Sequence, residues 1–257
     1  MAGIFETLIR DNDRVISIVG GGGKTSLMFL LAHAFQEKGI KVITTTTTRI
    51  LKPTPQQTGG VVFCDSNDFK DKLQKYLKQN GHATVASHLL SPGNKLQGIT
   101  FKQVEQIFEQ SSARRMIIEA DGARKLSFKA SGDNEPVVPE ITDVFISVVG
   151  IDIIGKSLED ESVFRAKLVS ERTGLAIAAK ITPLTVAQLA VHPKGLLKGC
   201  PEKARSYIYL NKIDIPDGRE KALLVMEAAK NLAGRKPDFW IIASTRDDIC
   251  ENHGLCL

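Results

Sequence analysis

Short apolar runs alternate with amphipathic segments along this chain. Residues 14–19 (RVISIV) form a β-branched run that ends in four glycines, and residues 24–38 then repeat apolar side chains at helical spacing. Gly39 is expected to end that helix, and residues 41–44 (KVIT) form the next strand. A strand, a loop, a helix and a second strand in this order predict a right-handed βαβ unit, and therefore a parallel sheet.

The same alternation continues through the rest of the chain. Further strands are expected at residues 61–63, 83–86, 116–118, 144–149, 207–210 and 239–243, and further helices at residues 68–79, 101–110, 163–172, 184–191 and 220–232. This order predicts a doubly wound, mainly parallel α/β sheet with helices on both faces. The strands at 61–63 and 83–86 could instead form an antiparallel excursion from the main sheet. Because no repeat or long linker interrupts the pattern, one domain over residues 1–257 is expected.

Composition narrows the class of protein. The chain has 257 residues, of which 42% are hydrophobic and 25% are charged, enough for a sizeable core without disulfide or metal staples. Its four cysteines are scattered, and residues 1–14 lack the apolar stretch of a secretory signal. No apolar run approaches the roughly 20 residues that span a bilayer. We therefore expect a reduced, cytoplasmic protein that does not insert into membranes.

The net charge of +5 is compatible with an anionic ligand. Lysines and arginines are spread along the chain with few aromatic residues between them, which is more typical of a solvated basic surface than of a nucleic-acid interface. A small polyanion such as a nucleoside triphosphate is therefore favoured over nucleic acid as the partner.

The glycine run is the strongest chemical signal. Phosphate binding requires a backbone that approaches closely and turns several N–H groups inward, which glycine permits with the least strain. The following helix adds its positive dipole end, Lys24 would neutralise the β- and γ-phosphates, and the Thr25 hydroxyl would bind Mg²⁺. The predicted phosphate-binding residues are Gly20, Gly21, Gly22, Gly23, Lys24, Thr25 and Ser26, and Lys24 is also predicted to be catalytic.

The loop follows a shorter pattern than the common P-loop. Ile18 occupies the first glycine position of G-x-x-x-x-G-K-[ST], whereas G-G-x-G-K-T-[ST] fits. The shorter pattern resembles the P-loop of the signal-recognition and metallochaperone class of NTPases. One branch of that class has a lysine before the glycines, but Val19 stands there, so no lysine acting across a dimer is expected, and a homodimer stays open. The order of strand, glycines, Lys-Thr and helix argues against a merely flexible turn.

A second signal follows the strand at residues 116–118. Glu119, Asp121 and Gly122 end this run as two carboxylates and a glycine, the form of a Walker B or [DE]-x-x-G segment. The two carboxylates could order Mg²⁺ through its waters or position the attacking water, and both are predicted to be catalytic. We favour Glu119 for Mg²⁺ and place Asp121 near the γ-phosphate switch, and the Gly122 N–H is expected to reach the γ-phosphate. The alternative is a polar turn after a core strand.

The third signal is N-K-x-D, formed by Asn211, Lys212 and Asp214 directly after a strand. Asp214 can accept hydrogen bonds from the N1–H and 2-amino groups of guanine, which adenine lacks. Two charge-assisted bonds of roughly 1.5–3 kcal/mol each would favour GTP over ATP by about a hundredfold or more. The alternative is that these residues merely cap the start of a helix, in which case they do not read the base. The expected nucleotide is therefore GTP or ATP. Residues 243–245 lie where a further base-contacting loop is expected.

Five threonines in succession end the second strand, where a parallel sheet opens toward its ligand. Threonine suits strands regardless of function, but hydroxyls on both strand faces must find partners. We therefore expect ligand contact from at least one of Thr45, Thr46 and Thr47. Arg49 or Arg124 is a candidate for stabilising transition-state charge.

Seven segments together are more specific than any one motif. They are VGGGGKTS at 19–26, VITTTTTRI at 42–50, IIEADGARKLSFKA at 117–130, NEPVVP at 134–139, VVGIDIIGKSL at 148–158, HPKGLLKGCP at 192–201 and LNKID at 210–214. On these segments, over almost its full length, the chain resembles the YqeC family of accessory proteins for selenium-dependent molybdenum hydroxylases. The resemblance implies maturation of, or selenium insertion into, a molybdenum hydroxylase with the help of nucleotide hydrolysis. It also implies that hydroxylase or its cofactor as a partner.

Two positions depart from the family pattern K-A-P-x-x-H-E-P. Ser131 stands at the proline position and Asn134 at the histidine position, so a role that needs an imidazole is not expected there. Lys129 and Glu135 match the pattern and are candidates for a second ligand site.

The C-terminal segment carries a separate candidate metal site. Cys250, His253 and Cys256 form C-x-x-H-x-x-C, three soft or borderline ligands close together. Chain ends are usually mobile and a fourth ligand is missing, which counts against a metal or selenium site here.

Three functions stay open. The first is an NTPase that couples Mg²⁺-dependent hydrolysis of GTP or ATP to metalloenzyme maturation. The second is a small-molecule kinase, whose acceptor would lie near the threonine run, Lys129 and Glu135. The third is a non-catalytic scaffold that docks on a hydroxylase when nucleotide is bound.

Overall fold

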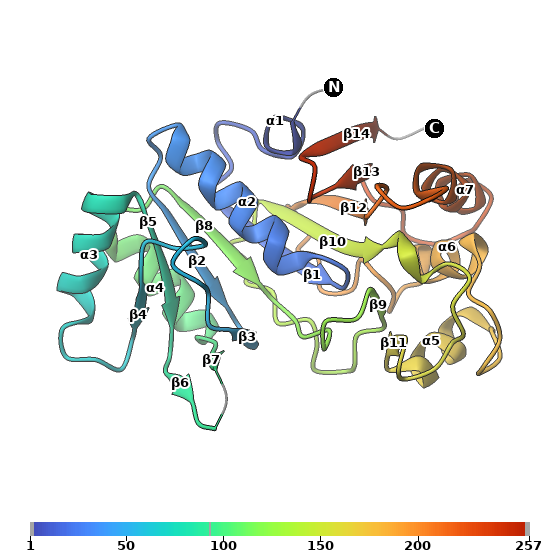
Figure 1. The fold of residues 1–257 in the computed structure, drawn as a ribbon, viewed down its shortest axis with the longest axis horizontal. Helices are drawn as coiled ribbons and strands as arrows, with labels where there is room; N and C mark the ends of the chain where they lie inside the picture. Colours follow the sequence, from blue (N-terminus) through green and yellow to red (C-terminus); the bar gives the residue numbers. More distant parts are fainter. Residues whose placement is uncertain (1–2, 93, 255–257) are drawn as a thin grey trace.

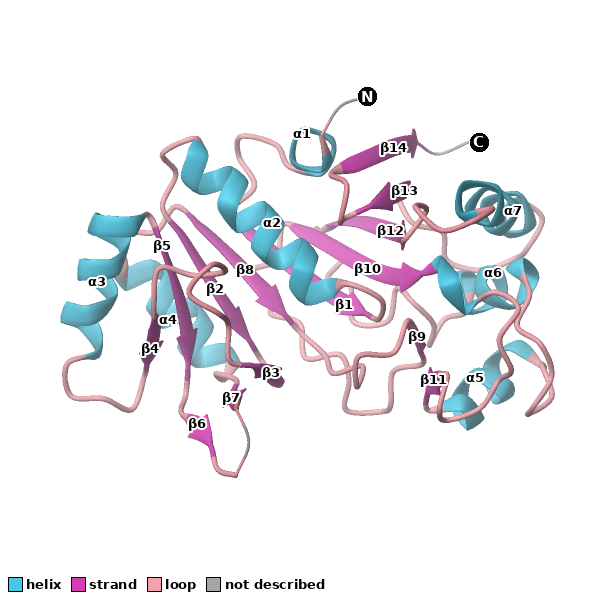
Figure 2. Ribbon diagram, in the orientation of Figure 1, coloured by secondary structure: helices cyan, strands magenta, loops and turns pink. Residues whose placement is uncertain are grey.

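The computed structural model describes residues 3–92 and 94–254 and centres on one nine-stranded sheet (Figures 1 and 2). In spatial order its strands are β14 (Ile249–Gly254), β13 (Phe239–Ser244), β12 (Arg205–Asn211), β10 (Val144–Gly150), β1 (Val15–Gly20), β8 (Arg115–Glu119), β2 (Val42–Thr46), β5 (His82–Ala86) and β4 (Val61–Phe63). Only the pairing of β13 with β14 is antiparallel. The predicted doubly wound, mainly parallel sheet is confirmed, and the antiparallel alternative for β4 and β5 is wrong.

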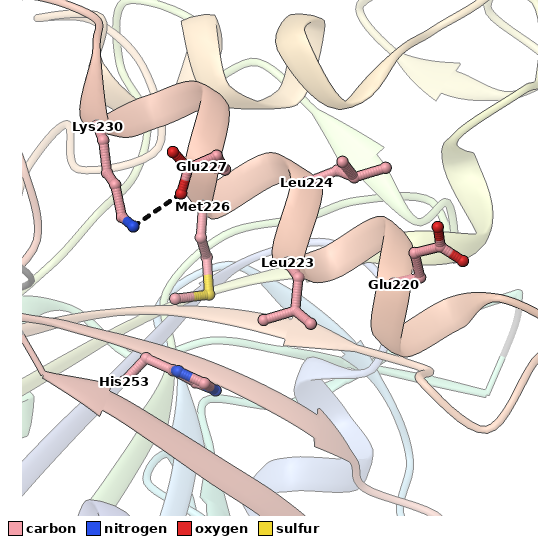
Figure 3. A pocket seen from close by; sticks show the side chains of 7 residues that line it. All are labelled: Glu220, Leu223, Leu224, Met226, Glu227, Lys230 and His253. Carbon is pink, nitrogen blue, oxygen red and sulfur yellow. Dashed lines mark hydrogen bonds and ion pairs between the residues drawn. The ribbon is translucent and has the colours of Figure 1, made fainter.

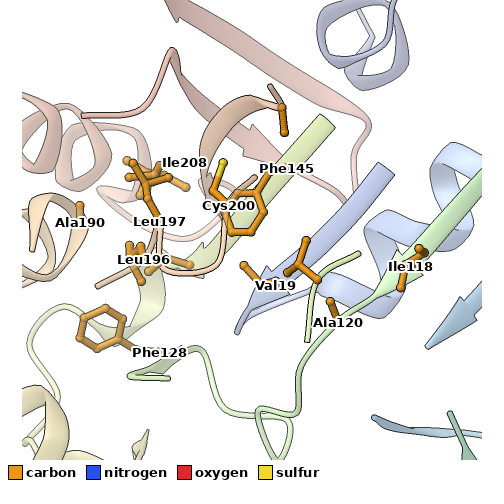
Figure 4. Packing of buried hydrophobic residues seen from close by; sticks show 14 of the residues in the cluster. Val19, Ile118, Ala120, Phe128, Phe145, Ala190, Leu196, Leu197, Cys200 and Ile208 are labelled. Carbon is orange, nitrogen blue, oxygen red and sulfur yellow. The ribbon is translucent and has the colours of Figure 1, made fainter. Parts of the chain in front are cut away.

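Helices cover both faces of this sheet (Figure 1). They are α1 (Ile4–Leu8), α2 (Lys24–Glu37), α3 (Phe69–Asn80), α4 (Phe101–Gln110), α5 (Ala166–Thr173), α6 (Pro183–Val191) and α7 (Gly218–Lys230). Alternate residues of β1 show the two sides: Ile16 and Ile18 pack with α1 and α2, whereas Val15 and Val19 belong to the core on the other face. Figure 4 shows Val19 in that core. In residues 3–92 and 94–254, no helix is both long enough and apolar enough to cross a bilayer.

Several short elements lie outside the main sheet. One antiparallel sheet contains β3 (Arg49–Leu51), β7 (Lys95–Gln97) and β6 (Leu89–Leu90), and a parallel pair joins β9 (Phe128–Lys129) to β11 (Val163–Phe164). A single 3₁₀ turn, η1 (Ile151–Ile153), follows β10. The helix expected at 163–172 therefore starts later, at Ala166. Strands of two or three residues show too little alternation to be predicted.

The direction of the strand connections reverses between β1 and its neighbour β10. β1 leads through α2 toward β2 on one side, whereas its neighbour β10 leads toward β12 on the other. In an open parallel sheet, this reversal opens a crevice at the carboxyl ends of the two strands. The glycine loop after β1 lies at that point.

The C-terminal segment is a strand, and this overturns the candidate metal site there. Cys250 and His253 are three residues apart on β14, so they face opposite sides of the sheet. Cys250 is buried beside Thr7, whereas His253 lines a mainly apolar pocket of about 270 Å³ against α7 (Figure 3). The described residues contain no cluster of three or more His, Cys, Asp or Glu that could hold a metal, and Cys256 lies outside them.

Candidate functional site

The four glycines from the last residue of β1 to the N-cap of α2 stand where no side chain fits. A Cβ added to Gly20, Gly21, Gly22 or Gly23 would lie only 2.2–2.5 Å from a neighbouring atom. Three of the four also have a positive φ, which favours glycine: 92° at Gly20, 80° at Gly22 and 131° at Gly23. Close packing of the loop, and not flexibility, therefore explains the glycine run.

Three of the glycine N–H groups are used inside the protein. Those of Gly20, Gly21 and Gly22 donate, respectively, to the Asp121 carboxylate and to the carbonyls of Val148 and Leu126, at 2.8–3.1 Å. The N–H groups of these three glycines are therefore not free for the phosphate contact expected of the glycine run. A packed loop must satisfy its own backbone donors, and the nearest strand ends supply the acceptors.

The first turn of α2 keeps its donors available. Gly23 is the N-cap and offers no side-chain acceptor, so the N–H groups of Lys24, Thr25 and Ser26 have neither a cap nor a partner within the helix. These residues line a cavity of about 830 Å³. Together with the positive end of the helix dipole, they form an anion-binding position.

Lys24 places a buried positive charge under the loop. Its Nζ donates to the Gly20 carbonyl at 2.6 Å and lies 3.1 Å from Asp121 Oδ1 and 3.6 Å from Glu119 Oε1. Burial opposes this charge, but Asp121 and Glu119 outweigh burial and raise the pKa of Lys24. The ammonium group therefore stays charged beside the anion-binding position.

Glu119 and Thr25, the two residues predicted to bind Mg²⁺, are in contact with each other in the cavity. The Thr25 hydroxyl donates to Glu119 Oε2 at 2.6 Å, and both residues line the cavity. Burial raises the pKa of Glu119, although the Lys24 charge and the Thr25 hydroxyl act in the opposite direction. A hydroxyl and a carboxylate side by side are oxygen ligands of the kind that Mg²⁺ accepts.

Asp121 takes a different place from the one predicted. It is fully buried and accepts from the Gly20 N–H at 2.9 and 3.1 Å, while the ammonium groups of Lys24 and Lys129 lie 3.1 and 2.9 Å from its oxygens. A carboxylate enclosed in this way cannot reach a water or a γ-phosphate in the cavity. Asp121 therefore positions the loop and Lys24, whereas Glu119 and Gly122 on either side of it line the cavity.

The buried charges continue away from the loop. Lys129 Nζ also donates to the Gly122 carbonyl at 2.7 Å and to Glu135 at 3.0 Å, and Glu135 pairs with Arg165 at 2.7 Å. Burial opposes the charge of Glu135, but Arg165 and Lys129 outweigh it and lower the pKa of Glu135. Lys129 is buried, so the expectation that it contacts a second ligand gives way to an internal ion pair.

The N-K-x-D residues lie against the glycine loop. Asn211 Nδ2 donates to the Gly22 carbonyl at 2.8 Å, and Asn211 Oδ1 accepts from the N–H and hydroxyl of Thr245 at 2.9 and 3.0 Å. Asp214 accepts from the Ser244 hydroxyl at 3.1 Å. The structure thus brings together the N-K-x-D segment, the loop at residues 243–245 and the phosphate loop.

Lys212 has partners that sequence reasoning missed. Its Nζ lies 2.7 Å from Ser127 Oγ and 3.0 Å from Asp152 Oδ2. Burial opposes the charge of Asp152, but Ser127 and Lys212 outweigh it and lower the pKa of Asp152. Neither Ser127 nor Asp152 belongs to a short motif, and only the loops after β8 and β10 bring them to Lys212.

The threonine run does not meet its predicted role. The hydroxyls of Thr45, Thr46 and Thr47 donate to the carbonyls of Val85, Glu119 and Val137, respectively, at 2.7–2.8 Å. None of the three lines the cavity. Buried hydroxyls need partners, and the neighbouring backbone supplies them here. Arg49 and Arg124, by contrast, both line the cavity.

Comparisons with known proteins agree with the family resemblance of the seven segments. A profile described as "YqeC protein" matches residues 16–167, more than half of the chain. The chain is 31% identical over 199 residues to "Uncharacterized protein YqeC" of Escherichia coli (strain K12), an alignment that covers 77% of this chain and 75% of that protein. The signal recognition particle receptor FtsY from Elizabethkingia anophelis matches with a TM-score of 0.37 and 15% identity. That match covers 92% of this chain but only 61% of the FtsY chain.

The packed loop generates one prediction. Gly22→Ala should lower the free energy of unfolding by about 2 kcal/mol or more, because the new Cβ meets the backbone of Gly150 at a positive φ. Gly254→Ala is the matched control, since its Cβ meets no atom of the described residues within 4 Å, and it should change stability by less than about 0.5 kcal/mol. Urea unfolding followed by circular dichroism measures both. Equal stabilities would show that the loop is not tightly packed.

Proposed function

The chain belongs to the YqeC family, and on that premise we propose that it is a P-loop nucleoside triphosphatase that binds GTP or ATP with Mg²⁺ and hydrolyses it slowly. The observation that carries this proposal is the uncapped first turn of α2, which opens into the cavity beside the Lys24 ammonium group. A phosphate there gains backbone donors, the helix dipole and a buried positive charge together. The order of strand, glycines, Lys-Thr and helix is the one that nucleotide-binding P-loops require.

Thr25 and Glu119 are the residues that would hold Mg²⁺. Their contact at 2.6 Å brings a hydroxyl oxygen and a carboxylate oxygen together, which supports this assignment. Bound Mg²⁺ would neutralise negative charge that develops on the phosphates during hydrolysis. Lys24 would contribute positive charge from the other side, while Asp121 holds Lys24 and the loop in place.

Guanine is the favoured base in this proposal. Asp214 already accepts from Ser244 and pairs with the exposed Arg246 at 3.2 Å, so its carboxylate is oriented before a base arrives. On binding, the N1–H and 2-amino groups of guanine would donate to Asp214 and replace its contact with Arg246. Asn211 links this base position to the phosphate loop through the Gly22 carbonyl.

The family resemblance supports a biological context for this chemistry. In it, nucleotide hydrolysis by one domain of residues 1–257 in the cytoplasm would serve maturation of, or selenium insertion into, a molybdenum hydroxylase. A second candidate is transfer of the γ-phosphoryl group to a small molecule. The cavity favours that candidate, because it extends past Glu119 and Gly122 to β3 and β7 and leaves room for an acceptor.

The metal part of the proposal predicts a difference between two Thr25 variants. Thr25→Val removes the hydroxyl at nearly constant shape, and the Mg²⁺-dependent gain in triphosphate affinity should fall about tenfold or more. Thr25→Ser keeps the hydroxyl and should retain most of that gain. Titration calorimetry with and without Mg²⁺ measures it. Identical Mg²⁺ dependence in both variants would exclude Thr25 as a metal ligand.

The base part predicts loss of nucleotide discrimination in Asp214→Asn. The amide replaces one acceptor with a donor, so the preference for GTP over ATP should shrink at least about tenfold. Asp217→Asn is the matched control, because Asp217 begins α7 without a side-chain cap bond. Competition between GTP and ATP for the wild type and both variants tests this. An unchanged preference in Asp214→Asn would remove the guanine assignment but leave the phosphate site intact.

A further inference from the structure

The cavity at the phosphate loop has an outer wall that the proposed nucleotide site does not use. Past Glu119 it is lined by β3 and the residues after it, by Lys95 of β7, and by the turn at residues 122–126. Among the described lining residues, none belongs to the N-K-x-D segment. The cavity therefore extends from the phosphate end of the site and away from the base.

The small sheet turns one charged face toward this space. Ile50 of β3 lies opposite Leu96 of β7, and both are buried in the core beside α2. Side chains alternate along a strand, so the neighbouring positions Arg49 and Lys95 lie on the other face. Both are exposed and line the cavity. Burial of Ile50 and Leu96 thus fixes the direction in which the two cations point.

The facing wall is a strained turn that also carries positive charge. Arg124 and Lys125 follow one another with φ of 49° and 64°, a left-handed conformation that non-glycine residues rarely adopt. The turn is closed by the Leu126 N–H, which donates to the Ala123 carbonyl at 2.8 Å. Strain of this kind persists where the surroundings hold a residue in a required position, often at ligand-binding sites.

The cations of this wall lack anionic partners. Five of them line the cavity: Arg49, Lys52, Lys95, Arg124 and Lys125. Within the described part of the chain, none of the five forms an ion pair, and Glu119 is the one acid on the cavity surface. Arg49 donates only to Gln97, and Arg124 stacks on the Phe164 ring at 5.0 Å. The buried Lys129, by contrast, is paired with Asp121 and Glu135. The excess of positive charge is therefore a property of this cavity wall.

We propose that this wall is a second binding site, for a small phosphate-bearing molecule that sits next to the γ-phosphate position. A phosphate group carries close to two negative charges at neutral pH, more than one carboxylate, and therefore better matches a cavity lined by five cations that have no ion pair within the described residues. Their position inside a cavity, without interleaved aromatic residues, suits a small ligand rather than a nucleic-acid strand. This proposal depends on the proposed function in one respect, namely that the γ-phosphate of a nucleotide lies at the first turn of α2.

The test uses inorganic pyrophosphate as the probe. The wild-type chain is first saturated with Mg²⁺ and a non-hydrolysable GTP analogue, and pyrophosphate, citrate or a single-stranded oligonucleotide is then titrated by calorimetry. We expect pyrophosphate to bind near one equivalent and more tightly than citrate or the oligonucleotide. Arg49→Gln combined with Lys95→Gln should weaken pyrophosphate about tenfold or more. Lys102→Gln, an exposed lysine of α4 outside the cavity, is the matched control and should leave the affinity unchanged.

The outcomes separate this site from the nucleotide site. No pyrophosphate binding in the nucleotide-loaded wild type, an unchanged affinity in the double variant, or tighter binding of citrate or the oligonucleotide overturns the proposal. An equal loss of affinity for the GTP analogue in the double variant also overturns it, because the cations would then belong to the nucleotide site. If the analogue itself fails to bind, the proposed function fails. Pyrophosphate binding that depends on Arg49 and Lys95 would still support the second site in that case.

Discussion

The ammonium group of Lys24 lies where the phosphate loop, α2 and the end of β8 meet, and the site is arranged around its charge. A buried charge is tolerated only when partners surround it, and Lys24 finds them in the Gly20 carbonyl, Asp121 and Glu119. Asp121 in turn accepts from the Gly20 N–H. The same contacts that neutralise Lys24 therefore shape the loop, while the lack of side chains at the glycines lets the loop pack against β10.

The charges around Lys24 nearly balance one another, so a bound triphosphate would need further cations beyond this set. Lys24 already faces two carboxylates, and Asp121 is shared with Lys129. Lys129 also pairs with Glu135, which in turn pairs with Arg165. A triphosphate adds several negative charges to this nearly balanced set. Mg²⁺ at Thr25 and Glu119 would offset part of them, and the cations of the β3 and β7 wall add positive charge beyond it. In the proposed function and the proposed second site, nucleotide, metal and second ligand would be coupled by electrostatics as well as by position.

The fold and part of the site could be predicted from the order of apolar runs along the chain and from short motifs. The order of apolar runs predicts the parallel sheet, and the phosphate loop, Glu119 and Asn211 come together because parallel strands end at one edge. The sheet of β3, β7 and β6 could not be predicted, since its strands are too short to show alternation. Motifs also do not say which polar groups the protein satisfies internally. The threonine run and Asp121 therefore proved structural, and the Lys212 partners Ser127 and Asp152 came from loops whose approach depends on the whole fold.

The most direct test of the account is whether the first turn of α2 binds phosphate. Titration calorimetry of a non-hydrolysable GTP analogue with Mg²⁺ into the intact chain should show one saturable site. Lys24→Ala, checked for retained folding by circular dichroism, should remove that site. A wild-type chain that gives no saturable heat with either a GTP or an ATP analogue would contradict the account, as would undiminished binding in Lys24→Ala.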